Sequence, residues 1–158
     1  MQIKAHVALI EKFYTAFSQK DAKTMAACYH QDLAFEDPAF GVLNHRQACA
    51  MWVMLLSGSS DIEISFKNVW SENEFGGVDW EAKYLFSKTG RKVHNVIDAK
   101  FEFKDGLIVG HRDHFDFYKW SRMALGMSGV LLGWTGFLHR KVQAQCAQLL
   151  SKHMAEHC

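Results

Sequence analysis

Two polar residues stand where the pattern of this chain requires apolar ones. His111 and Asp113 are two residues apart in an alternating segment, so a strand would place them on one face. Burying a carboxylate without partners costs several kcal/mol. The pair therefore indicates either an acid/base pair in a pocket or a buried hydrogen bond that fixes the strand register. We expect this face to point inward because its other members are Leu107, Val109, Phe115 and Phe117.

Asp37 is a second candidate carboxyl group. It alternates with Leu33 and Phe35 on one face of a short predicted strand, while Glu36 faces the other way. It also precedes Pro38, and the pattern alone favours a turn aspartate that closes the strand.

A third set of polar residues lies on the predicted strand 93–103. Its more apolar face includes Asn95, and its more polar face includes His94 and Asp98. Alternation therefore places Asn95 inside and Asp98 outside, unless a bulge reverses the strand.

Helical spacing dominates the first third of the chain that positions these residues. Apolar residues recur every three or four positions over 3–17, which predicts a first helix. Asp21 is a suitable N-cap for a second helix through Tyr29. After a turn at Gly41, Asn44 can cap a third helix, which would end at Ser57-Gly58.

From Asp61 onward the period changes to two, and helices return only at Tyr118. Helices followed by a run of antiparallel strands define an α+β fold. We expect a cone-shaped, curved antiparallel sheet wrapped around the N-terminal helices, with a hollow that binds a small molecule. Residues 1–117 would form this cone domain, and residues 118–158 would form a C-terminal helical extension packed on it. The predicted strands are residues 33–37, 62–67, 78–86, 93–103 and 107–117.

Composition argues against several classes of protein. The formal net charge of +1 at pH 7 gives no electrostatic footprint for nucleic acid. No glycine-rich nucleotide motif and no G-x-S-x-G occurs. His111 and Asp113 could supply two metal ligands, but a third would need His94 or Asp37 in a favourable geometry. We therefore expect neither a metal nor a cofactor.

Cysteine spacing and the uncharged segments bear on location. The four cysteines form no C-x-x-C pair and are expected to be reduced: Cys28, Cys49, Cys146 and Cys158. No basic stretch followed by an apolar run opens the chain, and we expect a cytoplasmic protein. The uncharged run 123–138 has 16 residues, fewer than the ~20 that span a membrane. It predicts a buried or interfacial segment, with contact to a membrane surface as the less favoured alternative.

Short motifs between Ile3 and Phe117 carry a family resemblance. They are Phe13-Tyr14-x-x-Phe17-x-x-x-Asp21, Tyr29-His30-x-Asp32, Phe35-Glu36-Asp37-Pro38 with Gly41, Asp105-Gly106-Leu107-Ile108, and Arg112-Asp113-x-Phe115-Asp116. This set resembles the nuclear-transport-factor-2-like superfamily, which includes ketosteroid isomerases, SnoaL-like polyketide cyclases and limonene epoxide hydrolases. The resemblance implies the cone fold.

The resemblance also implies roles for the carboxyl groups. Asp37 matches the general base of a Glu-Asp-Pro run in ketosteroid isomerases, and Asp98 matches their protonated oxyanion donor in a Val-Ile-Asp run. The position of their oxyanion tyrosine falls on Phe13, next to Tyr14. SnoaL-like cyclases carry their acid/base carboxylate where Asp113 lies. For Asp98, the resemblance and the alternation argument point to opposite faces.

These observations predict a protein that binds a small apolar carbonyl compound, steroid- or polyketide-like, in the cone. It would catalyse isomerisation or cyclisation by proton transfer through Asp37, His111, Asp113 and Asp98. The alternative is a non-catalytic ligand-binding or dimerisation domain, and we expect a homodimer. The C-terminal extension would close the cone or form the dimer interface. The residues expected to line the ligand site are Tyr14, Phe17, Phe35, Trp52, Trp80, Tyr84, Asn95 and Phe115.

Overall fold

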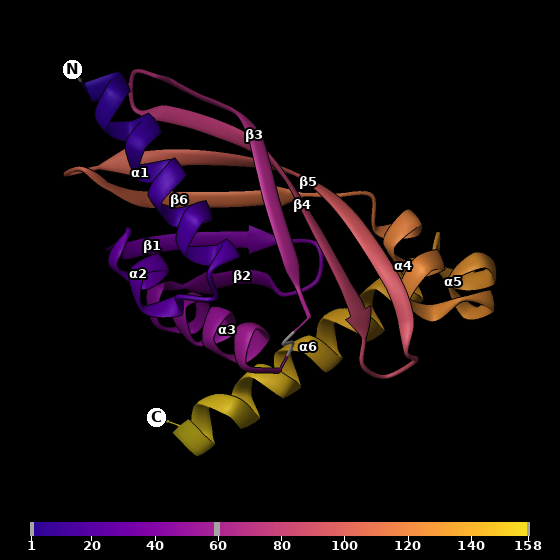
Figure 1. Ribbon diagram of the computed structural model, residues 1–158. Helices are drawn as coiled ribbons and strands as arrows, with labels where there is room; N and C mark the ends of the chain where they lie inside the picture. Colours follow the sequence, from indigo (N-terminus) through magenta and orange to yellow (C-terminus); the bar gives the residue numbers. More distant parts are fainter. Residues whose placement is uncertain (1, 59–60, 158) are drawn as a thin grey trace.

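The computed structural model describes residues 2–58 and 61–157, and these form a six-stranded sheet with helices at both ends of the chain. Figure 1 shows this order, and it confirms the predicted α+β fold. The helices are α1 (Gln2–Ser18), α2 (Ala22–Ala27), α3 (His45–Gly58), α4 (Phe117–Leu125), α5 (Met127–Leu132) and α6 (Gly136–His157). The strands are β1 (Tyr29–Asp37), β2 (Gly41–Asn44), β3 (Glu63–Glu72), β4 (Phe75–Phe86), β5 (Arg91–Lys104) and β6 (Leu107–His114).

The sheet is mixed rather than wholly antiparallel. Its strand order is β2-β1-β6-β5-β4-β3, and β1 runs parallel to its neighbour β6. The other neighbours pair in antiparallel fashion, as predicted. Alternation shows which side chains share a face but not which strand lies beside which. The parallel pair therefore could not be inferred from the pattern.

Two element boundaries near the start of the sheet differ from the prediction. The second helix ends at Ala27, and β1 begins at Tyr29, which the sequence had assigned to the helix. The stretch after the Gly41 turn is itself a short strand, β2. Asn44 does cap α3, since its Oδ1 accepts the Gln47 N–H while the Gln47 side chain accepts the Asn44 N–H.

The last strand is shorter than predicted and contains a bulge. β6 ends at His114 because Asp116 caps α4 by accepting the Lys119 N–H. The pairing of β5 with β6 shifts register near its start, and Ile108 rather than Val109 is buried there. The expectation that Val109 shares the inner face is therefore wrong.

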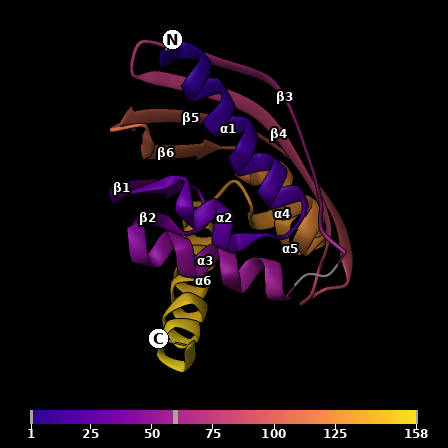
Figure 2. The ribbon, with the colours of Figure 1, turned by 60° about the vertical axis from the view of Figure 1, so that its left-hand side comes forward.

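Aromatic rings fill the space inside the curved sheet. Figure 2 shows the sheet bending around α1 and α3, and the buried core joins residues of these helices to the inner faces of the strands. Tyr14 packs 5.7 Å from Trp80, and Phe17 packs 4.9 Å from Trp52, measured between ring centroids. The predicted hollow is therefore occupied by side chains over most of the cone.

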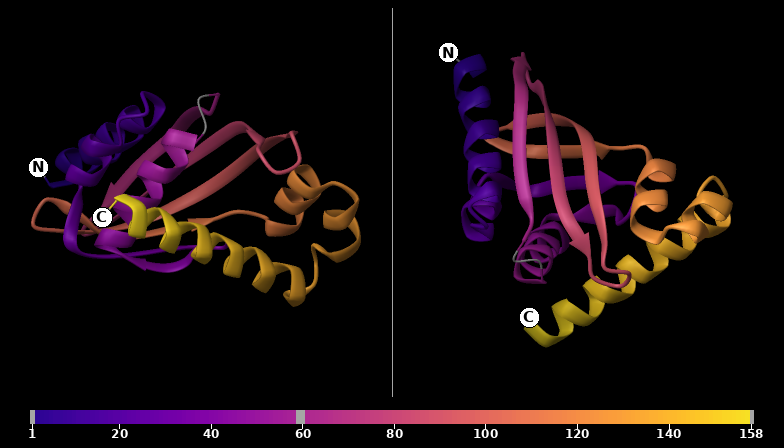
Figure 3. Two further views of the ribbon diagram at one scale, coloured as in Figure 1. Left: turned by 90° about the horizontal axis from the view of Figure 1, so that it is seen from below. Right: turned by 45° about the vertical axis from the view of Figure 1, so that its right-hand side comes forward.

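The C-terminal extension packs against the same body. α4 covers part of β5, and α6 crosses beneath α3, as the two views of Figure 3 show. Leu150 of α6 joins the main core. A second buried cluster connects the extension to β5 through Val93, Trp120, Ala124, Leu138 and Val142.

Within residues 2–58 and 61–157, no helix is long and apolar enough to cross a membrane. Cys28, Cys49 and Cys146 are free thiols. Cys158 lies outside the described residues.

Candidate active site

His111 and Asp113 point into the protein from β6. Their residues are only 2% and 5% exposed. The His111 Nε2–H donates to Asp113 Oδ1 over 2.9 Å. Strand alternation therefore placed both side chains on the correct face, and their hydrogen bond was one of the two interpretations that the pattern left open.

A directed chain of hydrogen bonds leads to this pair from α3. The Trp52 Nε1–H can only donate, and it donates to the Tyr29 hydroxyl oxygen over 2.9 Å. At the other end, the carboxylate oxygen of Asp113 accepts a proton from His111 Nε2, which leaves Nδ1 of the neutral ring as an acceptor. The Tyr29 hydroxyl therefore donates to His111 Nδ1 over 2.8 Å.

Asp113 receives a second donor on the same oxygen. The Trp80 Nε1–H from β4 reaches Asp113 Oδ1 at 3.3 Å. Among the described residues, no hydrogen bond reaches its other oxygen, Oδ2. Both donors meet the same oxygen, which leaves Oδ2 to a ligand.

Tyr29 is a residue that the sequence analysis did not assign to the site. The predicted second helix extended through it, and a helical Tyr29 would not have alternated with Leu33 and Phe35. Burial raises the pKa of its phenol well above the usual value, so it stays neutral. The signal that could have identified it is its place in the Tyr29-His30-x-Asp32 motif.

Asp37 lies at the end of β1, where its carboxyl closes the turn to β2. Its Oδ1 accepts the N–H groups of Ala39 at 3.0 Å and Phe40 at 2.6 Å. Burial, with a smaller contribution from the charge of Asp113, raises its pKa to about 7, although the Phe40 N–H opposes the shift. Asp37 is therefore both a turn aspartate and a carboxyl group that exchanges its proton near neutral pH.

The parallel pairing of β1 with β6 brings the two carboxyl groups together. Phe35 pairs with His111, and Glu36 pairs with Arg112. Continued by one residue, this register sets Asp37 beside Asp113 on strands about 4.8 Å apart. Both residues line the same cavity.

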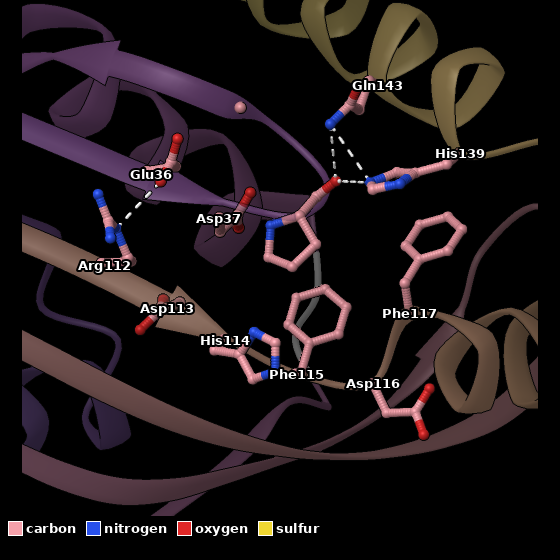
Figure 4. A pocket seen from close by; sticks show the side chains of 12 residues that line it. Glu36, Asp37, Arg112, Asp113, His114, Phe115, Asp116, Phe117, His139 and Gln143 are labelled. Atoms are coloured by element: carbon pink, nitrogen blue, oxygen red, sulfur yellow. Dashed lines mark hydrogen bonds and ion pairs between the residues drawn. The ribbon is translucent and has the colours of Figure 1, made fainter. Parts of the chain in front are cut away.

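This cavity has a volume of about 710 Å³ and opens where β1 and β6 end. Figure 4 shows Phe115 and Phe117 beside the cavity, with His139 and Gln143 reaching toward it from the neighbouring helix, α6. His139 and Gln143 donate to the Pro38 carbonyl at 2.6 and 3.1 Å, which ties α6 to the turn. The lining residues are Glu36, Asp37, Pro38, Gly41, Arg112, Asp113, His114, Phe115, Asp116, Phe117, His139 and Gln143.

Asp98 does not belong to this site. Its side chain is half exposed on the outer face of β5 and pairs with Lys100 at 3.2 Å. β5 alternates without a bulge at this point, and Asn95 is buried on its inner face. The role that the family resemblance implied for Asp98 is wrong, and the alternation argument is right.

Of the eight predicted ligand-lining residues, only Phe115 lines this cavity. Phe35 lines a second hollow, of about 420 Å³, together with His111. Tyr84 is partly buried, and its hydroxyl accepts the Trp120 Nε1–H at 2.9 Å. The others are buried and help to fill the interior: Tyr14, Phe17, Trp52, Trp80 and Asn95.

The Tyr14 hydroxyl is fully buried and finds no hydrogen-bond partner among the described residues. Burial, and next the charge of Asp113, raise the pKa of this phenol well above its usual value, which keeps it protonated. An unpaired buried hydroxyl costs about 1–3 kcal/mol.

Within residues 2–58 and 61–157, no three His, Cys, Asp or Glu side chains are grouped so as to hold a metal ion. The carboxyl groups of Asp37 and Asp113 on the cavity lining are groups that can exchange protons with a ligand.

The mixed sheet with its helices is the fold shared by proteins of the nuclear-transport-factor-2-like superfamily. A family model for the SnoaL-like domain matches residues 10–111, and the chain belongs to that family. A comparison with curated proteins gives no match.

Solved structures share the fold. A candidate polyketide cyclase from Xanthomonas campestris is 17% identical with a TM-score of 0.66, over 78% of this chain and 98% of that one. An LEH-like epoxide hydrolase from M. tuberculosis is 18% identical with a TM-score of 0.63, over 84% of this chain and 98% of that one. A candidate SnoaL-like polyketide cyclase from Jannaschia is 14% identical with a TM-score of 0.67, over 77% of this chain and 92% of that one. At such identities the likeness concerns the fold alone.

Asp37→Asn is expected to remove a pH dependence of stability. The folded-state pKa of about 7 exceeds the ordinary value of 3.8, so the folded protein holds an extra proton between these values. Wild-type stability therefore falls as pH rises from 4 through 7, relative to Asp37→Asn, by up to about 4 kcal/mol. Urea unfolding at pH 4.5 and pH 8 measures this difference. The exposed Asp98→Asn is the control, and parallel curves for wild type and Asp37→Asn would contradict the assignment.

Tyr14→Phe and Tyr29→Phe form a matched pair with opposite expected effects. Tyr14→Phe removes an unpaired hydroxyl and should raise the free energy of unfolding by about 1 kcal/mol. Tyr29→Phe leaves the Trp52 N–H and His111 Nδ1 unpaired and should lower it by about 1–3 kcal/mol. Denaturant unfolding measures the free energy of unfolding of each variant. Equal effects of the two changes would contradict the hydrogen bonds assigned to Tyr29.

Proposed function

We propose that this protein binds a small carbonyl compound in the 710 Å³ cavity and catalyses isomerisation or cyclisation by proton transfer. The observation that carries the proposal is the pair of carboxyl groups on neighbouring strands, Asp37 and Asp113, held in different surroundings. Asp113 receives two side-chain N–H donors, and Asp37 has a pKa of about 7. Such a pair can act as base and acid at the same pH.

In the proposed reaction, Asp113 removes a proton from the carbon next to the carbonyl group. The electron pair moves onto the carbonyl oxygen, and the protonated Asp37 carboxyl donates its proton to that oxygen. His111 and Trp80 keep their N–H groups on Asp113 Oδ1, which leaves Oδ2 to meet the substrate. His111 is thus a positioning residue.

Two outcomes follow from the same enol. In isomerisation, Asp113 returns its proton to a different carbon while Asp37 takes back its own. In cyclisation, the enol carbon forms a bond with a second carbonyl carbon of the substrate while the enol O–H returns its proton to Asp37. The resulting alkoxide then takes the proton that Asp113 removed from the carbon, so both carboxyl groups return to their starting states. Protons and electrons balance in both cases without an oxidant or a cofactor.

The cavity lining favours an oxygen-bearing, flat compound over a fully apolar one. Phe115, Phe117 and Pro38 offer apolar surface for the face of a ring. His114 and Gln143 lie on the same lining and can hydrogen-bond to oxygen substituents. A polyketide-like substrate meets both conditions better than a steroid. The fold shared with candidate polyketide cyclases supports this direction.

Binding without turnover is the second candidate function. The Asp113 side chain is only 3% exposed, and aromatic rings occupy the cone behind it. A ligand held only in the outer part of the cavity would not reach Oδ2.

Proton exchange separates the two functions. An aromatic β-diketone is incubated with the protein in deuterium oxide, and NMR follows loss of the signal of its central C–H. Catalysis predicts uptake of deuterium that Asp113→Asn slows by at least about 100-fold. The rate should fall as pH rises through about 7, as Asp37 loses its proton, and Asp37→Asn should abolish this dependence.

Asp98→Asn, on the outer face, serves as the control and should leave the exchange rate unchanged. Circular dichroism checks that each variant is folded. If wild type and Asp113→Asn bind the diketone equally and neither exchanges it faster than buffer, the protein is a binding module.

A further inference from the structure

Helix α5 buries its small residues and exposes its large ones. Gly129 and Gly133 pack against Ser121 of α4 so closely that a Cβ at either position would overlap it. The bulky apolar residues around them face away, with Met127 at 70%, Trp134 at 74% and Phe137 at 63% exposure. We call this surface the apolar tip, formed by Met127, Val130, Leu131, Leu132, Trp134 and Phe137.

The apolar tip lies at one end of the molecule. Figures 1 and 3 show α5 beyond α4, on the side away from the N-terminal helices. Isolated exposed apolar residues are common on proteins, but a group of six large ones on a short segment indicates a surface that another body covers. The sequence analysis identified the same segment, 123–138, as interfacial or buried.

Only basic charges surround the apolar tip along its own segment. Between Asp116 and Glu156 the chain contains no acidic residue. The basic residues that flank the tip on α4 and α6 are all exposed: Lys119, Arg122, Arg140 and Lys141.

The turn between β4 and β5 adds further positive charge at this end. Its Thr89 hydroxyl donates to the Ala124 carbonyl at 2.6 Å, and Arg91 Nε donates to the Met123 carbonyl at 2.8 Å. Two further exposed lysines lie beside these bonds, Lys88 in the turn and Lys92 at the start of β5.

We propose that the apolar tip docks on the surface of a membrane that contains anionic lipid. Leu, Phe and Trp side chains on a face rimmed by Lys and Arg are the combination that partitions into the boundary between headgroups and acyl chains. Trp134 and Phe137 would enter this boundary. The exposed basic residues that flank the tip on α4 and α6, which we call the basic rim, would attract the anionic headgroups.

A second copy of the chain fits this surface less well. A two-fold dimer through the apolar tip would bring the basic rim of one copy against the basic rim of the other. Like charges facing each other across an interface oppose association, whereas anionic headgroups complement the rim.

Docking would also hold the cavity near the lipid. Phe117 and His139, which line the cavity, lie on α4 and α6, the helices that precede and follow α5. The ring of His139 stacks on Phe117 with 4.3 Å between the ring centroids. An apolar substrate dissolved in the membrane would then have a short path to the site. This consequence rests on the proposed function, whereas docking itself does not.

Vesicle co-sedimentation with the full chain tests the proposal. We expect binding to phosphatidylcholine vesicles that contain phosphatidylglycerol, and at least about tenfold weaker binding to phosphatidylcholine alone or at high salt. Trp134→Ser with Phe137→Ser should abolish binding, and Arg140→Glu with Lys141→Glu should weaken it. Val42→Ser, which removes an equally exposed apolar residue from β2, is the matched control.

Fluorescence quenching by brominated lipid supplies a second measurement, because quenching should disappear in Trp134→Phe. The altered residues are exposed, so thermal unfolding should show that every variant folds. The proposal is overturned if anionic vesicles bind wild type and Trp134→Ser/Phe137→Ser equally, or bind neither. It is also overturned if light scattering shows a dimer that this double change dissociates while vesicles leave wild type unbound.

Discussion

The parallel contact between β1 and β6 is the constraint on which the candidate site depends. Without it, Asp37 closes an ordinary turn and Asp113 is a lone buried carboxylate. With it, Glu36 pairs with Arg112, and the residues that follow them, Asp37 and Asp113, line one cavity, where like charges disfavour ionisation of both carboxyl groups. Burial raises the pKa of Asp37 and the charge of Asp113 adds to the rise, so the protein gains an exchangeable proton beside a second carboxyl group.

The hydrogen-bond chain explains how the core tolerates that carboxylate. Its donors come from four separate elements, with Trp52 on α3, Tyr29 on β1, His111 on β6 and Trp80 on β4. Trp52 and Trp80 are also packing residues of the aromatic core. The same side chains therefore pack the core and donate the hydrogen bonds of the site. Substitutions among them are expected to affect stability and chemistry together.

Local patterns predicted what depends on a single strand or helix end. Alternation placed His111, Asp113 and Asn95 inside and Asp98 outside, because the strand period applies whatever the partner strand is. The Asn44 cap followed from side-chain chemistry alone. Strand neighbours and the filling of the cone could not be predicted, because they depend on contacts between distant segments. Tyr29 was missed for a local reason: helix ends are poorly marked, and one misplaced boundary removed it from the strand.

Hydrophobicity by itself also failed to determine which side of α5 is buried. The uncharged run 123–138 was expected to be buried or interfacial, and its pattern did not show which side chains would face the protein. The contact with α4 is made by Gly129 and Gly133, since only residues without a Cβ fit against Ser121. Burial in the extension is instead provided by Trp120, Leu138 and Val142 on either side. The large residues of the apolar tip are therefore dispensable for packing the fold. Their exposure does not follow from an incomplete core, and it requires an explanation outside the chain itself.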